Sequence, residues 1–118
     1  MTSDFDYSQL VVKPEYAEWM HKRLVELIND FEADLPDDMQ AGGRLVAFGG
    51  TTISIDDVGF WNPNLIVFDG TLLDPGGGKI QLVQHTSQLS ILLVAVPRLD
   101  TSKPRRVIGF SLEAPEER

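Results

Sequence analysis

The chain has 118 residues, and we expect residues 1–118 to form a single domain, because this length is enough to bury a hydrophobic core. No apolar run approaches the ~20 residues of a membrane-spanning helix, and the N-terminal stretch MTSDFDYSQ lacks the basic region of a secretory signal. The absence of cysteine excludes disulfides and thiolate catalysis. We therefore expect a cytoplasmic protein that does not associate with membranes.

Charge is unevenly distributed along the chain, whose net charge is −8. Residues 1–40 hold ten acidic and three basic residues, whereas residues 97–110 hold one acidic and four basic residues. An acidic protein repels phosphate backbones at long range, so we expect no general binding of nucleic acid. The basic segment is a candidate contact for a single phosphate or for an acidic partner.

An amphipathic helix is predicted over residues 14–35. Pro14 suits the first helical position, because the N–H that proline lacks would have no partner inside the helix there. The sequence Pro-Asp-Asp at residues 36–38 ends the helix, and residues 1–13 are expected to form a loose arm or a short edge strand. His21 lies among charged residues and is interpreted as a surface residue. The apolar residues that share one helical face are Tyr16, Met20, Leu24, Leu27, Ile28, Phe31 and Leu35.

Short strands are predicted after the helix. Gly49-Gly50 suits a hairpin turn. From residue 51 apolar and polar residues alternate, and a bulge is expected at Asp56-Asp57 because the apolar residues then change face. The expected elements are a flexible joint at Ala41–Gly43, strands at Arg44–Phe48 and Thr51–Val58, and a loop at Gly59–Asn64.

A second hairpin is predicted around the turn sequence Asp-Pro-Gly-Gly-Gly at residues 74–78. Leu89–Val96 is apolar on both faces, so we expect a central strand packed under the helix. A helix over Gln84–Val94 is the alternative, because short apolar runs are ambiguous by periodicity. The other expected elements are strands at Leu65–Leu73, Lys79–Gln84 and Arg106–Leu112, a connection at Gln84–Gln88, a loop at Pro97–Pro104 and a flexible tail at residues 113–118.

The predicted fold class is α+β. One N-terminal amphipathic helix precedes about six strands within residues 44–112, and the short connections favour antiparallel pairing. We expect a meander or a small, partly open barrel, with the helix on one face of the sheet or capping one end.

No residue pattern predicts a catalytic site, a metal site or a cofactor. The stretch GGGK at residues 76–79 lacks the first glycine and the following Ser or Thr of a phosphate-binding loop, so we interpret it as a turn. His85 lies in the stretch QHTSQ, but one short loop does not assemble the nucleophile, base and acid of a hydrolase. Four carboxylates could be considered as ligands of a hard cation, but they lack the spacing of a calcium-binding loop and are interpreted as solvated. They are Asp56, Asp57, Asp69 and Asp74.

Aromatic and basic residues are the candidates for binding. Phe60 and Trp61 either form a contact surface or fold under the sheet as a lid on the core. The basic residues, which include Lys103, either bind a partner's acids or phosphates or pair with the protein's own acidic helix. The candidate residues for a ligand or partner are Phe60, Trp61, His85, Gln88, Arg98, Arg105 and Arg106.

Three stretches resemble a family of small bacterial and phage-associated proteins known only as a domain of unknown function. They are RLVAFGGTTISIDDVGFWNPNLIVFDG, IQLVQHTSQLSILLVAVPR and KPRRVIGF, within Arg44–Phe110. This resemblance implies no activity. The chain is also similar to Sm-like barrels, which place a helix before about five strands. Phe68-Asp69-Gly70, Gly76–Gly78 and Gln81-Leu82-Val83 with His85 follow the order of that fold, and the similarity implies a fold only, because the acidic charge argues against an RNA-binding ring.

Three functions are consistent with the sequence. The first is a small, acidic, non-enzymatic interaction module that binds a protein partner or self-associates. A phage-associated inhibitor of a host protein is its most specific form. The alternative is an oligomeric barrel that binds a small ligand or nucleotide near His85, Gln88, Arg98 and Arg105. The third and least favoured function is a hydrolase that uses His85.

Overall fold

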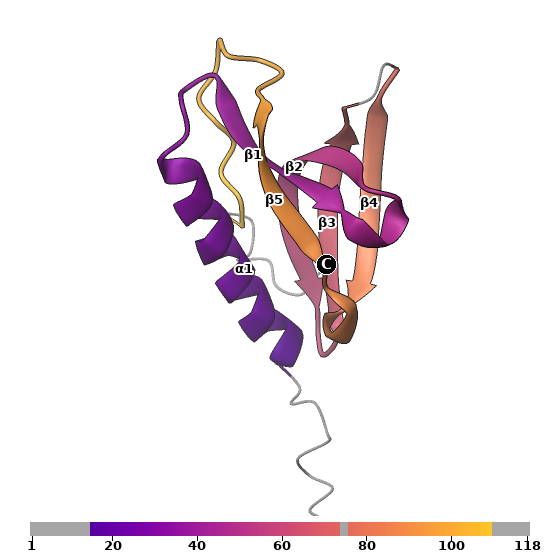
Figure 1. Cartoon of the computed structure of the whole chain (residues 1–118). Coiled ribbons are helices and arrows are strands. Elements are labelled where there is room, and N and C mark those ends of the chain that lie inside the picture. Colours follow the sequence, from indigo (N-terminus) through magenta and orange to yellow (C-terminus); the bar gives the residue numbers. More distant parts are fainter. Residues whose placement is uncertain (1–14, 74–75, 110–118) are drawn as a thin grey trace, which may run out of the picture.

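The computed structural model describes residues 15–73 and 76–109 (Figure 1). The predicted arm, the start of the helix at Pro14, part of the second turn, the end of the last strand and the tail lie outside the described residues. The α+β class is confirmed, with five antiparallel strands in place of about six. The elements are α1 (Tyr16–Ala33), β1 (Met39–Leu45), η3 (Val46–Phe48), β2 (Thr51–Trp61), β3 (Leu65–Leu72), β4 (Gly78–His85), η4 (Thr86–Gln88) and β5 (Ile91–Pro97).

The five strands form one open sheet in the order β4-β3-β2-β1-β5. β1 to β4 make a meander, and β5 returns to pair with β1. A flat sheet of five strands separates its edges by about 19 Å. The link between β4 and β5 consists largely of the compact 3₁₀ turn η4, so it is too short to span a flat sheet from one edge to the other. The sheet is therefore curled, as Figure 1 shows, and α1 covers one of its faces.

The prediction of a central strand at Leu89–Val96 is wrong, because β5 is an edge strand. The two faces of β5 are apolar for different reasons. Ile91 and Leu93 pack against the core, while Val96 on the other face is buried near Gly42 of β1. Leu92 remains 51% exposed. The central strand is β2.

The glycines at the start of the sheet belong to β1, so the prediction of a flexible joint is wrong. A Cβ at Gly42 would lie 2.5 Å from the backbone oxygen of Ile53, and a Cβ at Gly43 would lie 2.4 Å from Cδ1 of Ile91. These glycines permit β2 and β5 to approach β1 closely where the sheet curls. The strand ends at Leu45, and the residues predicted to extend it form the 3₁₀ turn η3.

β2 is longer than predicted, because residues 59–61 of the expected loop continue the strand. The register shift between Ile55 and Asp57 confirms the predicted bulge. The bulge returns Val58 and Phe60 to the same face as Ile55, where all three join the core. Phe60 is therefore a core residue, whereas its neighbour Trp61 is 60% exposed.

The predicted helix is confirmed, but its most buried face differs from the apolar stripe. The buried positions Ala17, His21, Ile28 and Glu32 follow one another at helical spacing, whereas Leu27 of the predicted stripe is 59% exposed. The prediction of a surface position for His21 is wrong, since only 2% of the residue is exposed. Its Nε2 lies 2.5 Å from the carbonyl oxygen of Val58, and its ring packs against Phe60.

Residues 98–109, here called the C-terminal strap, leave β5 and run back to α1 (Figure 1). The described part of the predicted strand Arg106–Leu112 is not a strand, so that prediction is wrong for residues 106–109. Ile108 of the strap is 3% exposed and belongs to the core. Among the described residues no helix is long and apolar enough to cross a membrane.

Candidate functional site

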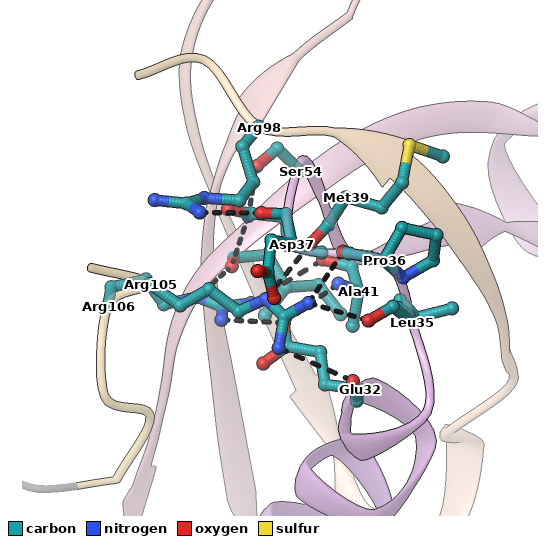
Figure 2. Close-up of polar contacts among 12 residues, drawn as sticks. Glu32, Leu35, Pro36, Asp37, Met39, Ala41, Ser54, Arg98, Arg105 and Arg106 are labelled. Carbon is teal, nitrogen blue, oxygen red and sulfur yellow. Dashed lines mark hydrogen bonds and ion pairs between the residues drawn. The ribbon is translucent and has the colours of Figure 1, made fainter. Parts of the chain in front are cut away.

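Arg105 of the strap binds the chain where α1 ends (Figure 2). Its Nε donates to the carbonyl oxygen of Met39 at 2.9 Å, and its Nη2 donates to those of Leu35 at 3.1 Å and Pro36 at 2.7 Å. Its Nη1 also donates to the carbonyl oxygen of Glu32, in the last turn of α1, at 3.5 Å. The last carbonyls of a helix have no partners within it, and a cation there also complements the helix dipole. Arg105 therefore closes the end of α1 and is not held ready for a ligand.

Arg98 fixes the beginning of the strap (Figure 2). Its Nη1 donates to the carbonyl oxygen of Asp37 at 2.6 Å, and its backbone N–H donates to that of Asp38 at 2.9 Å. Its Nη2 donates to the carbonyl oxygens of Asp100, at 3.2 Å, and Lys103. The guanidinium of Arg98 thus shapes the loop that follows β5.

Arg106 and Glu32 meet where β1 and β2 separate. Ladder pairing between these strands runs from Gly42 opposite Ser54 towards the other end of β1, so Ala41 and Ile55 lie beyond it. Glu32 Oε2 accepts from the N–H of Ala41 at 2.8 Å and from Arg106 Nη1 at 2.6 Å. Arg106 Nε donates to the carbonyl oxygen of Ile55 at 2.8 Å. The ion pair therefore replaces the missing ladder contacts.

A pocket of about 170 Å³ lies between the strap and the sheet. Gln40 and Ser54 are buried in its wall, where Gln40 Nε2 donates to Ser54 Oγ at 2.7 Å. The arginines in the lining direct their donors mainly to main-chain carbonyls of the protein itself. The pocket is lined by Gln40, Ser54, Asp56, Arg98, Leu99, Asp100, Lys103, Pro104, Arg105 and Arg106.

His85 has a local structural role at the start of η4. Its Nδ1 accepts from the backbone N–H of Ser87 at 3.1 Å and lies 2.9 Å from Ser87 Oγ. Within residues 15–73 and 76–109, no hydrogen bond or ion pair joins His85 to a carboxylate. A His–Ser pair without an orienting acid lacks one of the three parts of a hydrolase triad.

The predicted small-ligand residues lie at two different places. Gln88 precedes β5 and Arg98 follows it, so a strand of seven residues, about 20 Å long, separates them. Arg98, Arg105 and Arg106 come together at the strap pocket, whereas neither His85 nor Gln88 lines it.

His85 instead shares a cross-strand row with Trp61. Trp61 of β2 is opposite Leu65 of β3, and Leu65 is opposite His85 of β4. Residues opposite one another in adjacent strands present their side chains on the same face. The next row on this face contains Val67 and Val83. Trp61, Leu65, Val67, Val83 and His85 together are here called the Trp61 face.

The Trp61 face lies on the side of the sheet opposite α1, because the alternate residues Phe60, Ile66 and Phe68 pack into the core beneath the helix. Trp61 is 60% exposed and Val83 is 51% exposed. Acidic groups lie beside this apolar centre. Asp69 follows Val67 on the same face, and the carboxylate of Glu18 accepts from the side chain of Asn62 at 3.4 Å.

The carboxylates that the sequence singled out have separate partners. Asp56 accepts from Thr71 at 2.8 Å, Asp57 accepts from the backbone N–H groups of Val58 and Gly109, and Asp69 accepts from Gln81 at 2.8 Å. Asp74 lies outside the described residues. Within residues 15–73 and 76–109, no three His, Asp or Glu side chains gather as metal ligands.

Sequence reasoning missed Glu32, the ion-pair partner of Arg106, and it missed Gln40 and Ser54, which line the strap pocket. The charge pattern places Glu32 in an acidic helix, although Glu32 follows Ile28 by four residues and so lies on the same helical face. The four-residue spacing from Ile28, which belongs to the predicted apolar stripe, is the sequence signal that could have identified Glu32 as a buried residue.

A family model described as a family of unknown function, DUF6173, matches residues 9–111. No curated protein and no solved structure matches the chain.

Proposed function

We propose, on the premise that this chain belongs to DUF6173, a family of unknown function, that it is a small acidic, non-enzymatic module that binds a basic protein through the Trp61 face. The observation that carries this proposal is the row Trp61–Leu65–His85 on the sheet, in which Trp61 and His85 are exposed and Leu65 is half-buried, with the exposed Val83 in the next row. Exposed tryptophan beside aliphatic residues is typical of the centre of a protein interface.

Charge supports a basic partner. The chain carries a net charge of −8, and Asp69 follows Val67 on the Trp61 face. An interface of this kind fits a surface that has an apolar depression with basic residues around it, because complementary charge orients and accelerates association. In its most specific form, the proposal is a bacterial or phage-associated inhibitor that acts in the cytoplasm and occupies a basic site on a host protein.

The test compares two exposed tryptophans. The tagged chain, its Trp61→Ala variant and its Trp19→Ala variant are used to capture proteins from a bacterial lysate, and the captured proteins are identified by mass spectrometry. Trp19 is the matched control, because it is 50% exposed but lies on α1. Circular dichroism and thermal unfolding serve to check that both variants remain folded.

We expect one basic protein to be captured by the wild type and by Trp19→Ala and lost with Trp61→Ala. With the purified partner, Trp61→Ala should weaken the affinity by about 30-fold or more, the usual scale of a central tryptophan. Raising the salt concentration should slow association. Equal capture by all three proteins, or a captured partner without a basic surface, would refute the proposal.

The small-ligand alternative is ranked lower. The strap pocket has a volume of about 170 Å³, whereas small-molecule sites usually measure about 300–1,000 Å³. Its arginines also donate mainly to the protein's own carbonyls. A thermal shift with any member of a nucleotide panel, abolished by Lys103→Ala, would reverse this ranking.

A further inference from the structure

The outer edge of β5 presents main-chain groups that follow a definite pattern. The N–H of Arg98 donates to Asp38, the residue before β1, so it points towards β1. Main-chain groups of a strand alternate in direction, so Ala95, Leu93 and Ile91 direct their N–H and C=O groups away from β1. β5 is the last strand of the sheet, and none of the described segments pairs with this edge.

This edge lacks the features that normally prevent strands from pairing. Residues 86–97, TSQLSILLVAVP, contain no charged residue, and the pairing of β5 with β1 runs without a bulge from Leu45 opposite Ile91 to Met39 opposite Pro97. Soluble proteins usually place a lysine, an inward charge, a bulge or a proline on an exposed edge. Pro97 is present only at the last position. The opposite edge, β4, carries Lys79 and three polar side chains: Gln81, Gln84 and His85.

We propose that two copies of this chain pair through their β5 edges, antiparallel and around a two-fold axis at Leu93. In this register Leu93 lies opposite Leu93 of the other copy, and Ile91 lies opposite Ala95. These are the residues whose main-chain groups point outwards, so each donates to and accepts from the other copy. A contact around a two-fold axis uses the same surface twice and therefore forms a closed dimer.

Of the described surfaces through which two copies could meet, the β5 edge is the one where charge repulsion is least. Two chains that each carry −8 repel one another wherever their acidic surfaces meet. The β5 edge brings together uncharged strands, while the acids of α1 remain on another element. On the outer face, Leu92 of one copy lies opposite Val94 of the other, so the exposed leucine gains an apolar neighbour. The contact leaves the Trp61 face of β2, β3 and β4 free, so the dimer does not depend on the proposed partner.

The mass in solution tests the dimer. Light scattering after size exclusion should give twice the chain mass of 13.1 kDa at micromolar concentration and above. Leu92→Lys should shift the mass to that of one chain, because it removes the contact with Val94 and places two lysines diagonally opposite one another, about 7–8 Å apart at the main chain. Leu27→Lys is the matched control. Leu27 is 59% exposed on α1, and this variant should remain a dimer.

A backbone variant provides a second test. Ala95→Pro removes an outward N–H without removing a donor to β1, so it should also give the mass of one chain while circular dichroism remains unchanged. Amide exchange at Ile91, Leu93 and Ala95 should slow as concentration rises. A single-chain mass for the wild type at every concentration, or an unchanged dimer in both variants, would refute the proposal. A mass above two chains would also refute it, because it would indicate pairing of β5 with a different edge.

Discussion

The carboxylate of Glu32 lies 2.6 Å from Nη1 of Arg106, and the two side chains are only 8% and 20% exposed. This ion pair joins α1 to the strap at the place where β1 and β2 separate (Figure 2). Because the carboxylate also accepts from Ala41, its removal leaves a guanidinium and a main-chain N–H without that acceptor. The pair is therefore a structural element of the sheet as well as a link between segments.

Glu32→Ala should lower the free energy of unfolding by about 3–5 kcal/mol, the usual cost of removing one partner of a buried ion pair. Glu32→Gln should cost less, because its amide oxygen still accepts a hydrogen bond. Urea unfolding measures both effects. Glu26→Ala is the control, since Glu26 is 56% exposed in its pair with Arg23 and should change stability by less than about 1 kcal/mol. Equal losses for Glu32→Ala and Glu26→Ala would contradict the structural role of the buried pair.

Arg105→Lys should destabilise the protein by about 1–3 kcal/mol, because a single ammonium group cannot reproduce the geometry of a guanidinium that contacts four carbonyls. The effect should be greatest at the end of α1. Amide exchange should therefore accelerate in the last turn of the helix more than in its first turn. Arg23→Lys on the exposed side of α1 is the matched control. If both variants change exchange equally, Arg105 does not close the helix.

Gly42→Ala should cost about 1–3 kcal/mol and more than Gly43→Ala. A new Cβ at Gly42 meets a backbone oxygen, which cannot move without shifting β2. A new Cβ at Gly43 meets the end of the Ile91 side chain, which can rotate away. Chemical denaturation of the two single variants provides the comparison. A larger loss at Gly43 would show that the curl at β1 depends on β5 more than on β2.

Asp100 should titrate below its ordinary range. Hydrogen bonds from the side chain and the backbone of Ser102, with the charge of Arg98, lower the pKa of Asp100 from its ordinary value of 3.8. A lowered folded-state pKa stabilises the fold above the ordinary pKa, and this contribution is lost as the pH falls through the folded-state value. Ser102→Ala should raise the pKa of Asp100 in a carboxyl NMR titration. Thr101→Ala should leave it unchanged, and identical titrations for the two variants would exclude Ser102 as the cause.

Local patterns predicted the elements that local chemistry determines. Helical spacing located α1, the turn residues at 74–78 located the β3–β4 hairpin, and the change of apolar face at Asp56-Asp57 located the bulge in β2. Each of these signals lies within a few residues of the structure that it predicts. No distant part of the chain is needed to interpret them.

Positions that depend on distant segments could not be predicted in this way. A strand such as Ile91–Pro97 has the same sequence whether it lies at the centre or the edge of a sheet, and only its pairing with β1 decides. His21 and Glu32 are polar residues on a buried face because Val58 and Arg106 supply their partners across the fold. Arg98 and Arg105 gave no local signal either, since their acceptors are main-chain carbonyls that every sequence contains.

Because Arg98 and Arg105 bind main-chain oxygens, the residues that supply these oxygens can differ in type among members of the family. Arg98 and Arg105 contact Asp37, Met39, Leu35 and Pro36 through main-chain oxygens, so the contacts do not require those side chains. The acceptor positions are therefore free to vary while the arginines are retained. Glu32 is the exception, because its carboxylate itself binds Arg106, and the two should be lost or kept together. An alignment of relatives should show variable acceptors, constant arginines and one covarying pair.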